Sequence, residues 1–241
     1  MPQICGSIAE SSFTKMSWRT SLHMRFTQNL TSILSICACS LWVYGVYAKA
    51  LIPMIIGAYY CFPGMHDASH GSAPNWIGHL TCIPLLVPFN EFKQLHRRHH
   101  AYTNDPNKDP DYITQTHVLS WFVIPEVYVY HWLRHDTTLI ARLRGVASYV
   151  GMILLAVLLG GVWGTFRIFA ASRIAFSALV YLLDVLPHRD CPPRSKGARD
   201  ATCDPMKPAP LWFYILTAGQ CYHEMHHFNP VIPWHQLKPL L

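Results

Sequence analysis

The chain has 241 residues, of which 51% are hydrophobic and only 13% are charged, a composition that excludes intrinsic disorder and argues against an ordinary soluble enzyme. The net charge of +6 does not indicate a nucleic-acid partner, because lysine and arginine are spread along the chain rather than gathered on one element. Histidine is unusually frequent: 15 histidines outnumber the 13 acidic residues, which favours a role in binding metal.

The first predicted membrane element follows a cationic segment, residues 1–29. The apolar stretch from Leu30 to Phe62 contains one charged residue, Lys49, which divides it into two pieces close to the ~17–25 residues that span a bilayer. No signal-peptide cleavage site clearly follows, so we expect a retained anchor. The sequence therefore predicts a helical hairpin with Lys49 at its turn, at the start of a membrane domain over residues 30–241.

A second hairpin is predicted further along the chain. Two apolar stretches, Val146–Phe166 and Ile168–Leu186, are divided by Arg167 and ended by Pro187. The chain is thus predicted to be an all-α, polytopic membrane protein with about four transmembrane helices in two hairpins. Shorter apolar segments are expected to form interfacial or half-inserted helices: Leu80–Phe89, Val118–Tyr130 and Leu211–Tyr222.

Three histidine clusters lie outside the predicted spans: His66-Asp-Ala-Ser-His70, His96-Arg-Arg-His99-His100 and His223-Glu-Met-His226-His227. Helical positions i, i+3 and i+4 share one face, so the imidazoles of each cluster can converge on an ion. Eight imidazoles are too many for one metal ion and suit two. Asp67 and Glu224 stand beside the predicted ligands and are candidates for accepting a ring N–H and orienting the imidazole.

The predicted topology places the clusters together. An even number of crossings separates them, so all three face the same side of the membrane as the N-terminus. Most lysines and arginines lie on this side, whereas the opposite loops offer Lys49 and Arg167. By the positive-inside rule this face is cytoplasmic.

His188 directly follows the last predicted span, level with the three clusters. It is a candidate ninth ligand, although an interfacial position beside Arg189 explains it equally well. The loop after the second cluster has the composition of a solvated turn, and a subset of its side chains is a candidate for orienting histidines: Asn104, Asp105, Asp109 and Asp111. Isolated histidines are interpreted as surface, interfacial or hydrogen-bonded residues: His23, His79, His117, His131, His135 and His235.

The ligand type limits the choice of metal without fixing it. Imidazole binds zinc, copper, iron and nickel. A structural zinc site needs only four ligands and usually includes cysteine, which is absent from the three clusters. We therefore expect a redox-capable metal pair, with iron as the leading candidate.

These motifs resemble those of the membrane fatty-acid desaturase and hydroxylase superfamily, over about residues 30 to 240. Three strings are similar to those of desaturase-like β-carotene hydroxylases: the first cluster, the run from His96 to Asp111, and the third cluster followed by Pro230 and Pro233-Trp234. Gly71-Ser72 resembles the carotenoid ketolase branch, and Leu186-Pro187-His188-Arg189 resembles an element of ketolases and hydroxylases.

The resemblance implies a centre of two non-haem iron ions that activates O2 with electrons from an external donor, for which a ferredoxin-like protein is expected. Hydroxylation of the ring of a carotenoid such as β-carotene is the leading reaction. Ketolation of that ring and desaturation of an acyl lipid are the alternatives, because the ligands are the same for all three outcomes. The expected partners are the lipid bilayer and a lipophilic substrate.

Two other classes of function fit the pattern less well. A membrane metal transporter places polar ligands near the bilayer midplane, whereas the predicted spans here hold almost none. A non-catalytic homologue with a scaffolding role has no support, since all three clusters are intact.

Overall fold

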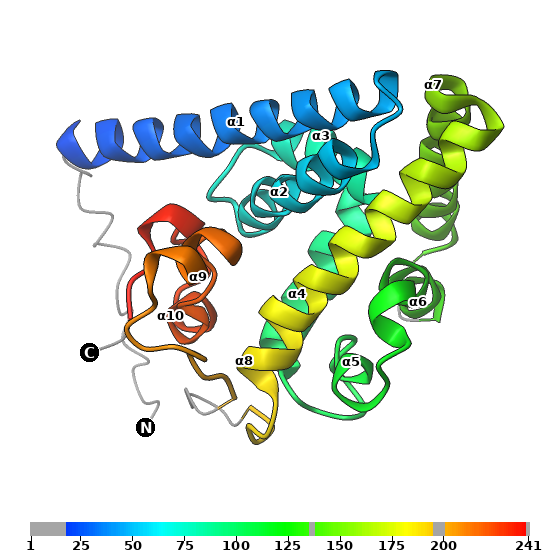
Figure 1. Ribbon diagram of the computed structural model, residues 1–241. Coiled ribbons are helices and arrows are strands. Elements are labelled where there is room, and N and C mark those ends of the chain that lie inside the picture. Colours follow the sequence, from blue (N-terminus) through cyan, green and yellow to red (C-terminus); the bar gives the residue numbers. More distant parts are fainter. Residues whose placement is uncertain (1–17, 135–137, 195–200, 240–241) are drawn as a thin grey trace, which may run out of the picture.

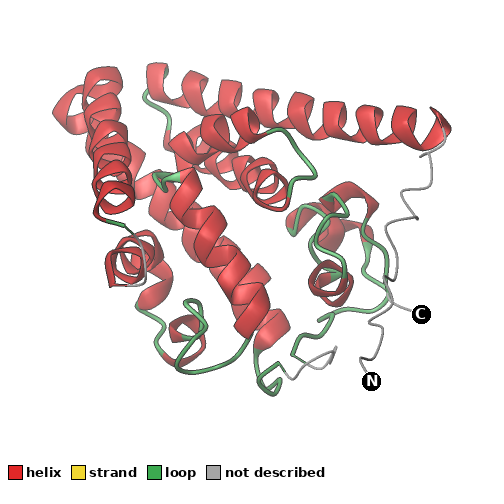
Figure 2. Cartoon of the chain, turned by 180° about the vertical axis from the view of Figure 1, so that it is seen from behind, coloured by secondary structure: helices red, strands yellow, loops and turns green. Residues whose placement is uncertain are grey.

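The computed structural model describes residues 18–134, 138–194 and 201–239, with side chains described from residue 30 onward. Every regular element within these ranges is a helix (Figure 2), which confirms the all-α prediction. Residues 1–17, the greater part of the predicted N-terminal segment, lie outside the described residues.

Helices α1 (Trp18–Tyr47) and α2 (Leu51–His70) form a hairpin. The chain turns at Lys49, which has a φ of 55°, and the N–H of Ala50 donates to the carbonyl of Gly45 at 2.9 Å. The two backbones approach closely at Gly57, where a Cβ would lie 2.6 Å from the backbone nitrogen of Trp42. The turn therefore lies where the sequence predicts it.

Short helices follow: α3 (Asn75–Leu85), α4 (Phe89–Tyr102), α5 (Ile113–Thr116) and α6 (Ser120–Arg134). Helix α4 is amphipathic and buries Phe89, Phe92 and Leu95 in the core. It also carries the second histidine cluster. Helices α3 and α6 contain most of the apolar segments that the sequence predicts as short interfacial helices.

Helix α7 (Leu139–Val180) is broken at Gly161, which has a φ of 60° and a ψ of −171°. These angles are open essentially to glycine alone, so the division lies at Gly161 and not at Arg167, where the sequence predicts it. The two halves meet at the upper right of Figure 1 and both run downward from there. The second half continues through the π-helical turn η1 (Tyr181–Val185) into α8 (Leu186–His188).

Long apolar surfaces face outward. Two helical stretches are long and apolar enough to cross a membrane, Leu30–Tyr47 and Leu139–His188. On α7, Leu158 and Trp163 are 82% and 77% exposed, and large apolar surfaces of this kind suit contact with lipid. The Lys49 turn and the Gly161 break lie at one end of Figure 1, away from α8 and the C-terminal helices.

The C-terminal part forms a small lobe from α9 (Leu211–Leu216), α10 (His223–Phe228) and the 3₁₀ turn η2 (Trp234–Gln236). The hydroxyl of Tyr59 on α2 donates to the carbonyl of Leu216. The backbone N–H of Trp234 donates to Asp67 Oδ1 at 3.3 Å. These contacts hold the third histidine cluster against the end of α2 (Figure 1).

Replacing Gly161 with alanine is expected to lower the thermal midpoint of unfolding in detergent, because a side chain at this φ and ψ is strained by about 1–3 kcal/mol. A Cβ at this position meets nothing within 4 Å, so the substitution tests backbone strain alone. Gly151→Ala is the matched control: Gly151 is helical, exposed and equally open, and alanine favours helix there. An unchanged midpoint for Gly161→Ala would contradict the break of α7 at Gly161.

Candidate metal centre

Nine histidines converge from four helices: His66 and His70 from α2, His96, His99 and His100 from α4, His188 from α8, and His223, His226 and His227 from α10. All are buried except His70, which is half-buried. The structure thus brings together every histidine of the three clusters, and His188 with them.

The first group holds five histidines: His66, His70, His96, His100 and His226. One ring nitrogen of each lies within 4.8 Å of those of the others. The Nε2 atom of His226 lies 3.0 Å from that of His66 and 2.9 Å from that of His100. His100 Nε2 is in turn 3.2 Å from His96 Nε2. The Nε2 atom of His70 is buried and has no hydrogen-bond partner among the described residues.

The second group holds four histidines: His99, His188, His223 and His227. His223 Nε2 lies 3.0 Å from His188 Nε2 and 3.1 Å from His227 Nε2. Two of the sequence clusters are therefore divided between the groups. On α4, for example, His99 belongs to the second group while its neighbours at positions 96 and 100 belong to the first.

Hydrogen bonds alone do not explain these contacts. His226 Nε2 carries either one lone pair or one hydrogen, yet it faces two other Nε2 atoms at 2.9–3.0 Å. An ion about 2.0–2.1 Å from each imidazole nitrogen places neighbouring nitrogens roughly 3 Å apart, as these are. The donor set therefore fits one metal ion in each group.

Burial keeps most of these rings neutral. It lowers the pKa of five imidazoles on α4 and α10 well below the usual range, and the neighbouring histidines add to the effect: His96, His100, His223, His226 and His227. Neutral imidazole is the form that binds metal.

His99 is held by carboxylates. Its Nδ1 atom lies 3.0 Å from Asp109 Oδ1 and 3.5 Å from Asp111 Oδ2. Burial lowers the pKa of His99, but the two carboxylates outweigh this and raise the pKa to about 10. Burial raises the pKa of Asp111 to about 6. Because Nδ1–H donates to Asp109, Nε2 is the nitrogen of His99 that is left for the second group, where a metal ion would take the place of its proton.

Two further rings are oriented by groups that the sequence analysis did not single out. His188 Nδ1 lies 3.1 Å from the carbonyl of Ala201, and the side-chain amide of Gln220 lies 3.1 Å from His66 Nδ1. The role of Gln220 could have been predicted from the sequence, because it is a polar residue inside an apolar segment, three positions before His223. The role of a backbone carbonyl such as that of Ala201 cannot be predicted from residue types.

The two carboxylates inside the histidine clusters, those of Asp67 and Glu224, form no hydrogen bond with a ring. Asp67 Oδ1 is 3.7 Å from His66 Nδ1. Asp67 instead accepts hydrogen bonds from the hydroxyl of Thr31 at 3.2 Å and from the backbone of Trp234. Glu224 faces outward, and Lys207 Nζ lies 3.3 Å from its carboxylate.

The isolated histidines lie outside both groups. His79 and His117 are exposed, and His131 and His235 are half-buried. The side chains of His23 and His135 lie outside the described residues.

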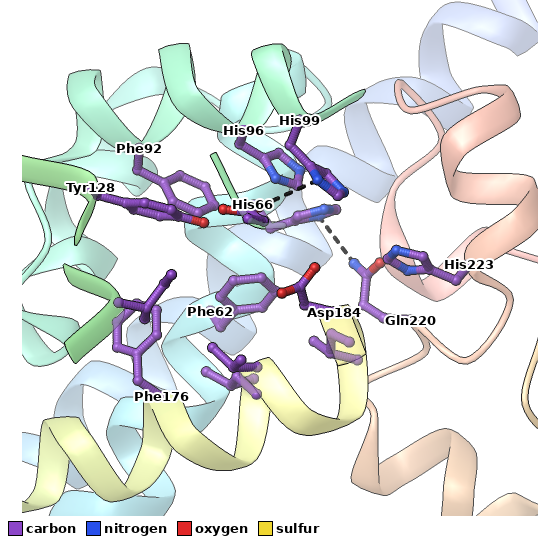
Figure 3. A pocket seen from close by; sticks show the side chains of 15 residues that line it. Phe62, His66, Phe92, His96, His99, Tyr128, Phe176, Asp184, Gln220 and His223 are labelled. Atoms are coloured by element: carbon purple, nitrogen blue, oxygen red, sulfur yellow. Dashed lines mark hydrogen bonds and ion pairs between the residues drawn. The ribbon is translucent and has the colours of Figure 1, made fainter. Parts of the chain in front are cut away.

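A cavity of about 50 Å³ adjoins the two groups (Figure 3). Phe62, Phe92 and Phe176 form part of its apolar wall. Its polar lining includes Asp184 and Gln220, and Figure 3 shows both side chains directed toward the histidines. An apolar cavity with polar atoms beside a metal-binding donor set is suited to oxidising an apolar molecule.

This helical fold gathers buried imidazoles into two groups, each of which could hold a metal ion. The family model described as fatty acid desaturase matches residues 40–241. The chain therefore belongs to the fatty acid desaturase family, a family of oxidoreductases, and the resemblance read from its motifs is confirmed.

The relatives include carotenoid and acyl-lipid enzymes. Beta-carotene 4-ketolase 3 of Haematococcus lacustris is 28% identical over 198 residues, which cover 71% of this chain and 55% of the ketolase. The sn-1 acyl-lipid omega-3 desaturase (ferredoxin) of Synechocystis sp. is 37% identical over 67 residues, 25% of this chain and 16% of the desaturase. A Delta(12) fatty acid desaturase of Caenorhabditis elegans is 31% identical over 107 residues, 39% of this chain and 25% of the relative. The chain thus spans 16% to 55% of the lengths of these relatives.

Replacing His188 with alanine is expected to remove one of two bound metal ions, because the second group loses one of its four imidazoles while the first stays intact. The measurement is metal content per chain, by elemental mass spectrometry of protein purified in detergent. His117→Ala is the control, since His117 is exposed and lies outside both groups. Full metal content in the His188→Ala variant would contradict a ligand role for His188.

Replacing Asp109 with asparagine is expected to weaken metal binding about 10–100-fold, because His99 loses the carboxylate that fixes its ring. Competition with a chelator measures the affinity. Asp105→Asn is the control: Asp105 lies in the same loop but pairs with the exposed Lys108 at 3.9 Å. Equal affinities for the two variants would show that Asp109 does not support the centre.

Proposed function

We propose that this chain is a membrane-bound, O2-dependent diiron oxygenase that acts on a ring carbon of a carotenoid. The observation that carries the proposal is the pair of histidine groups, which offers five and four imidazoles beside an apolar cavity. Two iron ions, held by these histidines, supply the activation of O2 that breaks an unactivated C–H bond. No other donor set of this size occurs among the described residues.

The proposed topology has four spans, with the histidines on the cytoplasmic side. The reversals at Lys49 and Gly161 support two hairpins, because each turns a long apolar stretch back on itself. The excess of lysine and arginine on the side of the histidines supports the orientation. This arrangement lets a lipophilic substrate approach from the bilayer while electrons arrive from the aqueous side.

The electron donor is proposed to be a ferredoxin-like protein. One acyl-lipid relative carries ferredoxin in its name. The histidines of the centre are buried, but the loops that follow α8 and α10 are exposed. An electron donor would therefore approach the centre over these loops.

The chain's own residues confine the substrate. The aromatic side chains of Phe62, Phe92 and Phe176 exclude water and bind an apolar ring by contact. The position of the ring carbon against the two histidine groups then decides which C–H bond reacts.

Hydroxylation is the reaction that the sequence motifs favour. The matches to ketolases cover 71% of the chain, and they support the ketone as the alternative product. The acyl-lipid desaturases match over shorter stretches, 25% and 39% of the chain, and acyl desaturation is the next candidate.

Expression in bacteria that accumulate β-carotene, together with a ferredoxin and its reductase, is expected to yield oxygenated carotenoids. Chromatography and mass spectrometry identify them, and an alcohol differs from the ketone by two hydrogens. His99→Ala is expected to abolish the products, because it removes a ligand of the second group, whereas His117→Ala is expected to retain them. Unchanged β-carotene in cells that contain iron-loaded protein would redirect the assignment to acyl lipids.

A further inference from the structure

Four buried polar atoms in residues that line the cavity have no hydrogen-bond partner among the described residues. One is Nδ1 of His223, a candidate metal ligand, and the other three are oxygens: Oδ1 of Asp111, Oδ1 of Asp184 and Oε1 of Gln220. Asp111 is 6% exposed and Gln220 is 2% exposed. Buried polar atoms almost always have partners, so three around one cavity indicate that it receives a polar group.

The two carboxylates are fixed in place beside the second histidine group. Oδ2 of Asp111 lies 3.5 Å from His99 Nδ1, and the hydroxyl of Thr114 donates to Oδ2 of Asp184. One oxygen of each carboxylate lies within 4.8 Å of the other and of a ring nitrogen of His99. Their remaining oxygens are therefore held as acceptors close to where oxidation takes place.

Gln220 adds a third acceptor. Its NH2 group lies 3.1 Å from His66 Nδ1, and its amide oxygen is left without a described partner in the cavity lining. Three oxygen acceptors around one cavity match a group that donates a hydrogen bond, and a hydroxyl group is such a donor.

The geometry points to a subsite, formed by Asp111, Asp184 and Gln220, that binds a hydroxyl group of the substrate. This inference rests on the proposed function and deepens it, because it selects the ketone, the alternative product there, over the alcohol. The alcohol made by a first oxidation is held beside the second histidine group, so that the same carbon is oxidised again to a ketone. A cavity of about 50 Å³ accommodates a hydroxyl group, since one water molecule needs roughly 10–15 Å³ of such space.

The two oxidations balance with the reactants of the proposed function. The first converts a ring CH2 into CH–OH; it consumes one O2, two electrons and two protons, and it releases one water. The second breaks the remaining C–H bond and the O–H bond and forms C=O. It consumes one O2, two electrons and two protons from the same donor system, and it releases two waters. The ketone has no hydrogen to donate to the carboxylates, so it is bound less tightly and leaves.

The test is a competition in which iron-loaded protein, supplied with reductant, oxidises an equimolar mixture of β-carotene and its ring alcohol. The wild-type protein is expected to prefer the alcohol. Asp184→Leu removes an acceptor and is expected to lower this preference about 10–100-fold, the usual effect of leaving a buried hydrogen-bonding group without its partner. Asp184→Asn keeps an oxygen acceptor and is expected to recover most of the preference. The ratio is measured within one reaction, so it does not depend on how much of a variant is folded.

The outcomes separate this inference from the proposed function. A wild-type protein that oxidises neither carotenoid contradicts the proposed function itself. Oxidation of both carotenoids, with the same preference in wild type and Asp184→Leu, overturns the subsite and leaves water as its occupant. A second measurement needs no variant: isotope-labelled alcohol is added during turnover of β-carotene. If the protein keeps its own alcohol bound between the two oxidations, the ketone carries no label. A ketone that carries the label in the same proportion as the free alcohol would show that the alcohol leaves the protein between the two steps.

Discussion

The structure depends on the convergence of nine buried imidazoles at the meeting point of four helices. Ring nitrogens that face one another at 2.9–3.2 Å repel unless positive charge lies between them. Burial lowers the pKa of most of these rings, so metal ions rather than protons suit this role. Helix α10 has only six residues, fewer than the ~12–15 that an isolated helix needs in water. Its position therefore depends on the histidines that it shares with α2, α4 and α8.

The carboxylates around the centre have different structural roles. Asp109 fixes the ring of His99, whereas Asp67 joins α1 to the C-terminal lobe through Thr31 and Trp234. Asp111 and Asp184 have one oxygen each without a described partner in the cavity lining. The protein thus places its carboxyl groups where they orient a candidate ligand, connect helices or face the cavity.

The sequence predicts the local part of this arrangement well. Spacing along a single helix identifies the histidine clusters, and Lys49 marks the first turn because a charge interrupts an apolar stretch. The assignment of His99 to a different group from its neighbours is not predictable from spacing, because it depends on which helix faces each side of α4. The sequence predicts the second turn at Arg167, because its charge interrupts an apolar stretch. The turn lies at Gly161 instead, because it needs backbone angles that arginine cannot adopt. Partners such as Asp109 and the carbonyl of Ala201 depend on loops that fold back on the centre.

Specificity must reside outside the ligands, because the same histidines serve hydroxylation, ketolation and desaturation. The three reactions differ in how long the oxidised substrate stays in the cavity and in which of its bonds then lies beside the metal centre. An entirely apolar cavity would release an alcohol as readily as a hydrocarbon, and the reaction would stop after one oxidation. Polar atoms beside the second group would change this balance, because leaving them would cost the alcohol its hydrogen bonds. In the proposed subsite Asp184, on the π-helical turn that precedes α8, is therefore the residue through which the same metal centre would yield a different product.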